Sequence, residues 1–374
     1  EIQKLNQSKV QKLLSIHRGY IDGVSSSIIK EITDLISRKN IEQVFIDGSN
    51  FGAISKAVKK QHPNVRITIF FHNSECRFFY GAFLANPSIH SAGVLLSNYY
   101  AEKFSVHFSD LRICLNHRDS ELLGKIYKKK ATHISELAMR DNFDSERQSN
   151  KIEANPNYES NFLLFVGGNF YANMDGIKWF LLNVAPSLDI KIKVVGRGLD
   201  SLKSFEDQKN IDIVGEVKDL SKWYQSCLCV IAPIFDGSGM KTKVAEALMF
   251  GRKVVGTKES FTGYEVFHDE IGWVCTSAKD FIQAIEIAQD SIINPFHENL
   301  REIFVKEFSQ GKFKKLPVLK FKSDLKLGFM MFLKALPFIF VYIGLMLILT
   351  LINDWLRLSI DTLLKILVVP MLTI

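Results

Sequence analysis

Hydrophobic and polar positions alternate regularly along the first third of the chain. Between Ser25 and Arg38, isoleucine and leucine recur at helical spacing, which predicts an amphipathic helix. We then expect strands at 43–47, 65–71 and 111–115, and helices at 51–61, 94–108 and 118–128. This alternation is typical of a parallel sheet flanked by helices.

A polar stretch without periodicity, residues 140–160, is interpreted as a linker between two domains. Beyond it, strands are expected at 162–166, 192–195, 211–214, 228–232, 253–255 and 273–274. Helical patterns separate them, so we predict an α/β fold with two Rossmann-like doubly wound domains that face a cleft. We place these domains at residues 1–145 and 146–310. Ligands of such sheets bind at the carboxyl ends of the strands.

The most informative segment runs from residue 232 to residue 248, where a buried apolar run leads into a glycine turn and then a helix. The turn and the helix start comprise Gly237, Ser238, Gly239, Met240, Lys241 and Lys243. Glycines permit a close backbone approach, and a helix start suits a phosphate. Glu246, one turn further, can accept hydrogen bonds from ribose hydroxyls. The alternative is a plain turn in which Glu246 pairs with a lysine and Lys241 points to water.

Other polar or glycine residues also follow strand ends and would converge on the same crevice. They are Gly168, Asn169, Arg197, Glu216 and Val217. The backbone at Gly168 and Asn169 can approach phosphate, and an arginine such as Arg197 can clamp a diphosphate. The backbone at Glu216 and Val217 can contact a base. A solvated loop position remains open for Arg197.

Two further polar clusters stand at the ends of strands in the N-terminal half. Residues 72–75 read His-Asn-Ser-Glu, so His72 either lines the crevice or belongs to a group that caps the next helix. Residues 116–119 read Asn-His-Arg-Asp. We interpret this second cluster as a helix start with capping side chains.

Together these segments resemble the family 4 ("group 1") glycosyltransferases of the GT-B fold, in the subgroup of bacterial capsule and O-antigen assembly. The resemblance rests on the glycine turn and on Phe165–Asn169, Asn173–Asp175, Val194–Gly198, Ile213–Val217, Val254–Thr257 and Gly263–Glu265. It implies retaining transfer from a nucleotide-sugar donor that the strand-end residues bind. It gives catalytic roles to His72, Lys243 and Glu246. The first strand and glycine loop of that fold are not seen before Gln43, so we interpret the chain as N-terminally truncated.

One position departs from the family pattern. Many members carry two glutamates eight positions apart, and here Ser238 stands where the first would be, with Asp236 two positions away. The residue that contacts the sugar is therefore open. A non-catalytic, membrane-tethered nucleotide-sugar-binding or scaffold protein, and an epimerase on the same fold, remain as alternatives.

The charge and the cysteines of the chain limit which partners and cofactors we expect. The net charge is +7, and part of it comes from lysines in residues 311–334, which we interpret as a basic linker. Lysines beside an apolar segment suit anionic membrane lipid better than nucleic acid, for which no module is recognised. The five cysteines fit no metal or redox motif, and no Asp-x-Asp sequence is present, so we expect neither a metal nor another cofactor.

The chain ends in an apolar stretch. Residues 335–352 are 18 positions without charge, close to the ~20 that a bilayer core requires. We predict a transmembrane or hydrophobic tail at 335–374, with the catalytic part on the cytoplasmic face of the membrane. The acceptor would then be a lipid-linked or growing surface saccharide. A buried hairpin, or the start of a further membrane domain, are the alternatives for the tail.

Overall fold

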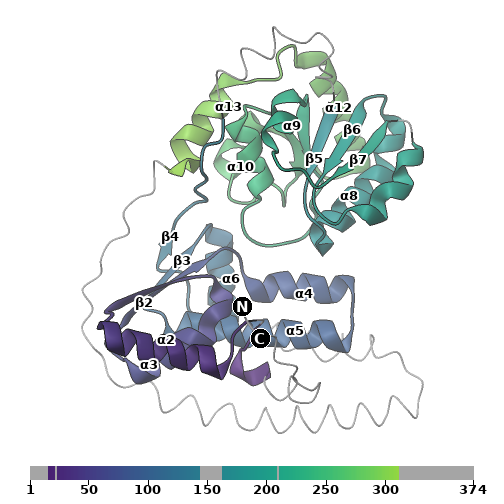
Figure 1. The fold of residues 1–374 in the computed structure, drawn as a ribbon. Coiled ribbons are helices and arrows are strands. Elements are labelled where there is room, and N and C mark those ends of the chain that lie inside the picture. The colour runs from purple at the N-terminus through teal and green to yellow at the C-terminus, as the bar shows by residue number, and fades with distance from the viewer. Residues whose placement is uncertain (1–15, 22, 144–161, 209, 311–374) are drawn as a thin grey trace, which may run out of the picture.

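The structure is a computed structural model that describes residues 16–21, 23–143, 162–208 and 210–310. The described residues form two domains, with the N-terminal domain below the C-terminal one in Figure 1. Most of the predicted linker, the basic segment 311–334 and the apolar tail 335–374 lie outside the described residues. Within the described ranges, none of the helices combines the length and hydrophobicity that crossing a bilayer requires.

The N-terminal domain contains a parallel sheet with the strand order β1-β2-β3-β4. Its strands are β1 (Gln43–Asp47), β2 (Arg66–Phe71), β3 (Leu111–Cys114) and β4 (His133–Ile134). Its helices are α2 (Ser26–Lys39), α3 (Gly52–Gln61), α4 (Glu75–Ala85), α5 (Ile89–Phe108) and α6 (His117–Tyr127), with short 3-10 turns at Ile16–Arg18 and Ser49–Phe51. The three strands predicted from periodicity are present, within one residue at either end.

The helices of this domain show what periodicity misses. Helix α5 begins at Ile89 rather than at residue 94, because Ser88 and Ser91 form a reciprocal capping box at its start. Helix α4 has no clear apolar stripe, since aromatic and aliphatic side chains occupy most of its positions. Figure 1 shows α4 and α5 side by side, with α4 on the side that faces the C-terminal domain.

The C-terminal domain is a six-stranded parallel sheet with the order β10-β9-β8-β5-β6-β7. The strands are β5 (Phe162–Val166), β6 (Lys191–Val195), β7 (Ile211–Gly215), β8 (Cys229–Ala232), β9 (Val254–Thr257) and β10 (Gly272–Cys275). The helices are α8 (Tyr171–Asn183), α9 (Ser221–Ser226), α10 (Thr242–Met249), α11 (His268–Ile271), α12 (Ala278–Ser291) and α13 (Glu298–Ile303), with 3-10 or π turns at Ala185–Ser187, Asp200–Asp207, Glu265–Phe267 and Phe304–Phe308. All six predicted strands are found.

The order of these strands determines where a ligand can bind. From β5 the chain adds β6 and β7 on one side, and it then returns to add β8, β9 and β10 on the other. The sheet therefore has a topological switch point between β5 and β8, where neighbouring loops diverge and leave a crevice. One hydrophobic cluster joins the sheet to α8 and α12, and a second joins its other face to α9, α10 and α13.

The chain crosses from one domain to the other after β4. Ser135 still donates its N–H to Cys114 of β3 (2.9 Å), whereas Met139 donates to Phe308 (2.7 Å) and accepts from Gln310 (3.0 Å) at the C-terminal end of the described chain. Leu137, Met139 and Phe143 pack against the core of the C-terminal domain. Residues 137–143, which the sequence analysis assigned to the N-terminal domain, therefore lie on the other one.

A fully buried carboxylate organises the interior of the N-terminal domain. Glu102 of α5 accepts hydrogen bonds from the backbone N–H groups of Glu75 (2.8 Å) and Cys76 (3.1 Å) and from the Tyr127 hydroxyl (2.9 Å). The hydroxyls of Ser49 and Ser74 also reach it, each at 3.3 Å. It thereby caps the start of α4 from another helix and fixes the loop between β2 and α4. Burial raises the pKa of Glu102 to about 7.

We predict that Glu102→Gln reduces the pH dependence of stability. Between pH 4.5 and about 7 the native state holds a proton on Glu102 that the unfolded state has lost, so the free energy of unfolding falls as the pH rises through that window. A carboxamide cannot ionise, and it keeps an acceptor oxygen for one of the two backbone N–H groups, which bind different oxygens of Glu102. The urea midpoints measured near the lower and upper ends of this pH window should therefore differ less in the variant than in wild type. Glu121→Gln, at an exposed carboxylate, is the control, and an unchanged slope in Glu102→Gln would contradict the prediction.

Candidate functional site

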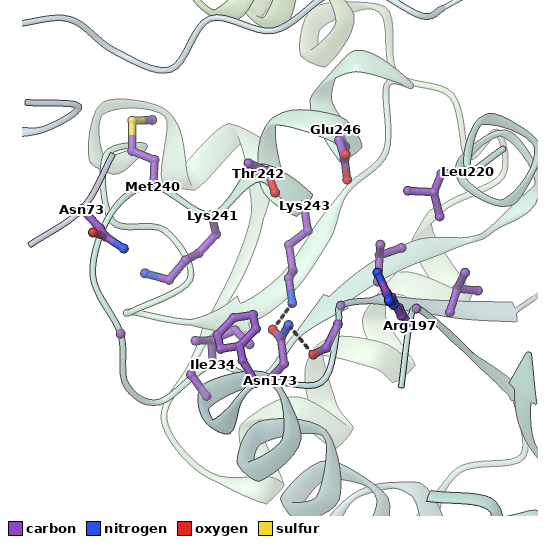
Figure 2. Close-up of a pocket in the computed structure, with 18 of the residues that line it drawn as sticks. Asn73, Asn173, Arg197, Leu220, Ile234, Met240, Lys241, Thr242, Lys243 and Glu246 are labelled. Carbon is purple, nitrogen blue, oxygen red and sulfur yellow. Dashed lines mark hydrogen bonds between the residues drawn. The ribbon is translucent and has the colours of Figure 1, made fainter. Parts of the chain in front are cut away.

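A cavity of about 510 Å³ opens at the carboxyl ends of β5, β6 and β8, at the switch point of the C-terminal sheet. Asn73 and Phe78 of the N-terminal domain form part of its wall, so the cavity lies between the domains (Figure 2). Most of the residues predicted from sequence line it, namely Gly168, Arg197, Glu216, Val217, Gly237, Ser238, Met240, Lys241, Lys243 and Glu246. His72, Asn169 and Gly239 do not.

Lys243 occupies the centre of this cavity wall, in the first turn of α10. Its side chain is 7% exposed, and its ammonium group lies 4.3 Å from the centre of the Phe165 ring. It donates a hydrogen bond to the amide oxygen of Asn173 (2.8 Å), whose nitrogen donates in turn to the Gly168 carbonyl (3.0 Å). Figure 2 shows Lys243 and Asn173 pointing toward each other. Burial lowers the pKa of Lys243 to about 7, a shift that nearby Lys241 enhances and Glu246 opposes.

The backbone around Lys243 adds to the positive character of the wall. The first N–H groups of a helix have no partner within that helix, and they carry the positive end of its dipole. Thr242 and Lys243, the first two residues of α10, both line the cavity. An ammonium group and a helix start therefore point at the same space, which suits a phosphate.

Glu246 lies one turn further along α10. The Tyr224 hydroxyl donates to one of its carboxylate oxygens at 2.6 Å, and the Tyr224 ring stacks on Phe250 with ring centres 5.5 Å apart. Burial raises the pKa of Glu246, while the Tyr224 bond and the charge of Lys243 oppose that rise. Tyr224 thus fixes one carboxylate oxygen of Glu246. The second oxygen has no hydrogen-bond donor among the described residues, so it can accept a hydrogen bond from a ligand hydroxyl in the cavity.

The two ends of the cavity differ in character. Figure 2 shows Arg197 and Leu220 at one end and Asn73 and Met240 at the other, with Lys243 between them. Glu216 and Val217 also line the cavity, and they follow β7, which lies beside the strand β6 that precedes Arg197. Asn169 holds this wall from behind, because its N–H donates to the carbonyl of Arg197 (2.9 Å).

At the other end, the glycine turn is bound to the N-terminal domain. Ser238 donates from its hydroxyl to the Ser74 carbonyl (3.1 Å), and Gly239 donates from its N–H to the Asp119 carboxylate (3.0 Å). Lys241 forms an ion pair with Glu259 (2.7 Å). Three of the predicted residues are thus engaged with protein groups. Of the two lysines in the motif, only Lys243 lacks a carboxylate partner among the described residues.

The side chain of His72 points elsewhere. It is exposed, pairs with Asp47 at 2.6 Å, and contacts the edge of Phe70, whereas the neighbouring Asn73 lines the cavity. Helix capping in this region comes from Glu102 rather than from His72. At residues 116–119 the predicted helix start is present, because Asn116 accepts from the Asp119 N–H at 2.8 Å.

Several cavity residues were not identified from sequence as site residues. Asn73, Phe78, Asn173 and Asp236 line the cavity, and Tyr224 supports Glu246 from behind. Asp236 forms an ion pair with Arg77 and accepts from the Tyr171 hydroxyl (3.3 Å). Asn173 did carry a signal, as a polar residue in the first turn of the helix after the Gly-Gly loop. Among the residues that the structure describes, no group of three or more His, Cys, Asp or Glu side chains could hold a metal ion.

Comparison with known proteins agrees with this geometry. Residues 160–290 match the family model described as glycosyl transferases group 1, which covers the strands and helices that build the cavity. No curated protein sequence matches the chain. This match supports the resemblance to the group 1 glycosyltransferases over residues 160–290.

Solved structures with a similar fold span both domains. Sucrose-phosphate synthase from Thermosynechococcus elongatus has a TM-score of 0.63 at 12% identity, over 83% of this chain and 78% of that one. A glycosyltransferase from Rickettsia africae ESF-5 has 0.57 at 13%, over 83% and 80%. HepE from Anabaena, in complex with UDP, has 0.55 at 13%, over 76% and 78%. The α/β fold with two parallel sheets is therefore that of GT-B glycosyltransferases, as the sequence predicted.

We predict that Lys243→Met stabilises the ligand-free protein at and below pH 7. A buried ammonium without a carboxylate partner is destabilising, and a methionine of similar volume should raise the free energy of unfolding by on the order of 1 kcal/mol. Because the pKa of Lys243 is lowered from 10.5 to about 7, the native lysine is neutral above pH 7 while the unfolded one stays charged. Wild-type stability therefore rises from pH 7 toward 10.5, and the gain in the variant shrinks over the same range.

Thermal unfolding at about pH 6 and about pH 9 measures both effects. Lys258→Met, at an exposed lysine outside the cavity, is the matched control and should change stability little. A Lys243→Met variant that is less stable than wild type at both pH values would show that the lysine is a structural element of the core.

Proposed function

We propose that the protein is a glycosyltransferase that moves a sugar from a nucleoside diphosphate donor to an acceptor hydroxyl. One observation carries the proposal: the buried ammonium of Lys243 faces a cavity at the start of α10 and forms no ion pair with a carboxylate of the described residues. A diphosphate would supply the missing charge. The match of residues 160–290 to the group 1 glycosyl transferases supports the reaction class.

We propose one orientation for the donor in this cavity. The diphosphate would lie against Lys243 and Thr242, and the ribose hydroxyls would donate to Glu246. The base would occupy the end near Arg197 and Val217, with the sugar at the end between the domains. HepE, which is similar in fold and whose structures include complexes with UDP and with UDP-glucose, supports a nucleotide-sugar donor.

Catalysis would rest on charge that develops on the leaving group. As the bond from the anomeric carbon to the diphosphate oxygen breaks, negative charge grows on the phosphate beside Lys243 and the start of α10. These groups stabilise that charge more strongly in the transition state than in the bound donor. The acceptor oxygen would form the new bond, and its proton would pass to the departing phosphate. Retention of the anomeric configuration is proposed from the family resemblance, and no metal is assigned to the diphosphate.

The sugar end of the cavity uses residues other than a paired glutamate. Ser238, which stands at that family position, donates to the Ser74 carbonyl. Asp236 lines the cavity instead, held by Arg77 and Tyr171, and we propose that it contacts the transferred sugar. His72, exposed beside Asp47 at the carboxyl end of β2, is proposed to contact the acceptor.

We further propose that the acceptor is a lipid-linked or growing surface saccharide at the cytoplasmic face of a bacterial membrane, as in capsule or O-antigen synthesis. The basic segment 311–334 and the apolar segment 335–374 of the sequence support this location. They also support anionic lipid, rather than nucleic acid, as the partner of the basic segment. A non-catalytic nucleotide-sugar-binding protein is the second candidate. The position of Ser238 favours it, because a serine stands where many family members carry a glutamate.

A thermal-shift screen of the full chain against UDP, GDP, ADP and their common sugar conjugates tests the proposal. Stabilisation by one nucleotide class at micromolar concentration would support it and identify the base. Incubation of the stabilising conjugate with saccharide acceptors then separates the candidates. Transfer of the sugar to an acceptor supports a transferase, and conversion of the sugar without an acceptor supports an epimerase. Binding of the conjugate without any reaction supports a scaffold protein. A folded chain that responds to no nucleotide would overturn the proposal.

We predict that Lys243→Ala and Glu246→Ala each weaken UDP binding at least tenfold, or about 1.4 kcal/mol. The first removes the cation that faces the diphosphate, and the second removes the acceptor for the ribose hydroxyls. Isothermal titration calorimetry at about pH 6.5, where Lys243 is largely protonated, measures the affinities. Lys258→Ala should bind UDP as wild type does, and unchanged affinity in both cavity variants would refute the site assignment.

A further inference from the structure

The glycine turn of the C-terminal domain is held by the N-terminal domain at four positions. We call residues 236–241 the donor loop. Its contacts with the other domain are Asp236 to Arg77, Ser238 to the Ser74 carbonyl, Gly239 to Asp119, and Lys241 through Glu259 to Arg118. The shape of a loop that lines the cavity therefore depends on the neighbouring domain.

The contact between Asp119 and Gly239 is made by a buried carboxylate. Asp119 is the third residue of α6 and is 1% exposed. Asn116, which caps this helix, accepts from the Asp119 N–H (2.8 Å) and donates to carboxylate atom Oδ2 (3.0 Å). The same Oδ2 accepts the N–H of Gly239 at 3.0 Å. A helix cap in one domain thus aims a carboxylate oxygen at the backbone of the other.

Gly239 is shaped for this contact rather than for the cavity. Its φ is +70°, and a Cβ atom there would lie 2.7 Å from the His72 carbonyl oxygen. Any side chain would therefore separate the N-terminal backbone from the donor loop. Gly239 does not line the cavity, although Ser238 and Met240 on either side of it do. Its contact with Asp119 lies behind the cavity wall and orients that wall.

The energetics of this contact depend on the two domains being together. Burial raises the pKa of Asp119, because a carboxylate is poorly solvated there. A buried carboxylate is tolerated when it accepts hydrogen bonds, and Gly239 supplies one of them only while the domains are together. The adjacent Arg118 binds Glu259 at 2.6 Å, so two successive residues of α6 hold the C-terminal domain.

We infer that Asp119 is a positioning residue for the proposed sugar transfer. It holds the donor loop in the shape that completes the sugar end of the cavity when the domains close, and it releases the loop when they separate. This inference rests on the proposed function. Lys243 and Glu246 lie on α10, outside the donor loop, so loss of Asp119 should reduce turnover while nucleotide affinity is kept.

Asp119→Ala in the full chain tests the inference, with Glu121→Ala on the exposed face of the same helix as the control. Hydrogen exchange with UDP bound should become at least tenfold faster across residues 236–241 in Asp119→Ala and stay unchanged in the control. Hydrolysis of the donor identified by the thermal-shift screen should lose at least tenfold in kcat, with KM within threefold. Asp119→Asn keeps an acceptor oxygen and should recover part of both effects.

A second variant approaches the same contact from the other domain. Gly239→Ala should accelerate exchange in the donor loop and lower kcat as Asp119→Ala does, without weakening UDP binding. Wild-type exchange and wild-type kcat in Asp119→Ala would overturn the inference. So would a loss of UDP affinity equal to the loss in kcat, because Asp119 would then merely maintain the fold. If wild type binds no nucleotide, the proposed function fails. Hydrogen exchange without ligand then still tests whether Asp119 holds the donor loop in place.

Discussion

The ammonium group of Lys243 lies almost fully buried, with an amide oxygen and an aromatic face as its neighbours. The surrounding elements are arranged so that this charge faces the cavity: α10 starts there, the strand order reverses there, and Asn173 links the lysine to the Gly168 loop. Stability alone does not favour such a group. Its presence at the switch point is understandable if a ligand supplies the opposite charge.

The sequence was sufficient to locate the part of the candidate site that lies on α10. Lys243 and Glu246 are three positions apart in one amphipathic helix that follows a glycine turn, and local spacing alone puts both side chains on the cavity face. Nine of the ten strands that the structure describes could be predicted for the same reason, since apolar runs of four to six residues have a local signature. The two-residue strand β4 (His133–Ile134) is too short to carry one and was not predicted.

Contacts between distant segments left no such signature. Asp119 and Gly239 are 120 residues apart, and nothing in either motif indicates that they meet. The sequence predicted Gly239 as a donor contact, whereas its N–H donates to the other domain. In the same way, periodicity could not show that Asn73 rather than His72 lines the cavity. The direction of these side chains depends on the loop before α4, which Glu102 holds by accepting hydrogen bonds from the first N–H groups of that helix. The bounds of α4 were not predicted because apolar residues fill most of its faces.

The crossing between the domains has a further mechanical consequence. Backbone hydrogen bonds attach the chain to the N-terminal sheet at Ser135 and to the C-terminal end of the described chain at Met139, so this crossing has only residues 136–138 in which to bend. So short a connection keeps the domains from sliding far past each other and leaves rotation as the easier motion at this point. A crossing of this kind can act as a hinge, and rotation about it would return the donor loop to the same N-terminal residues.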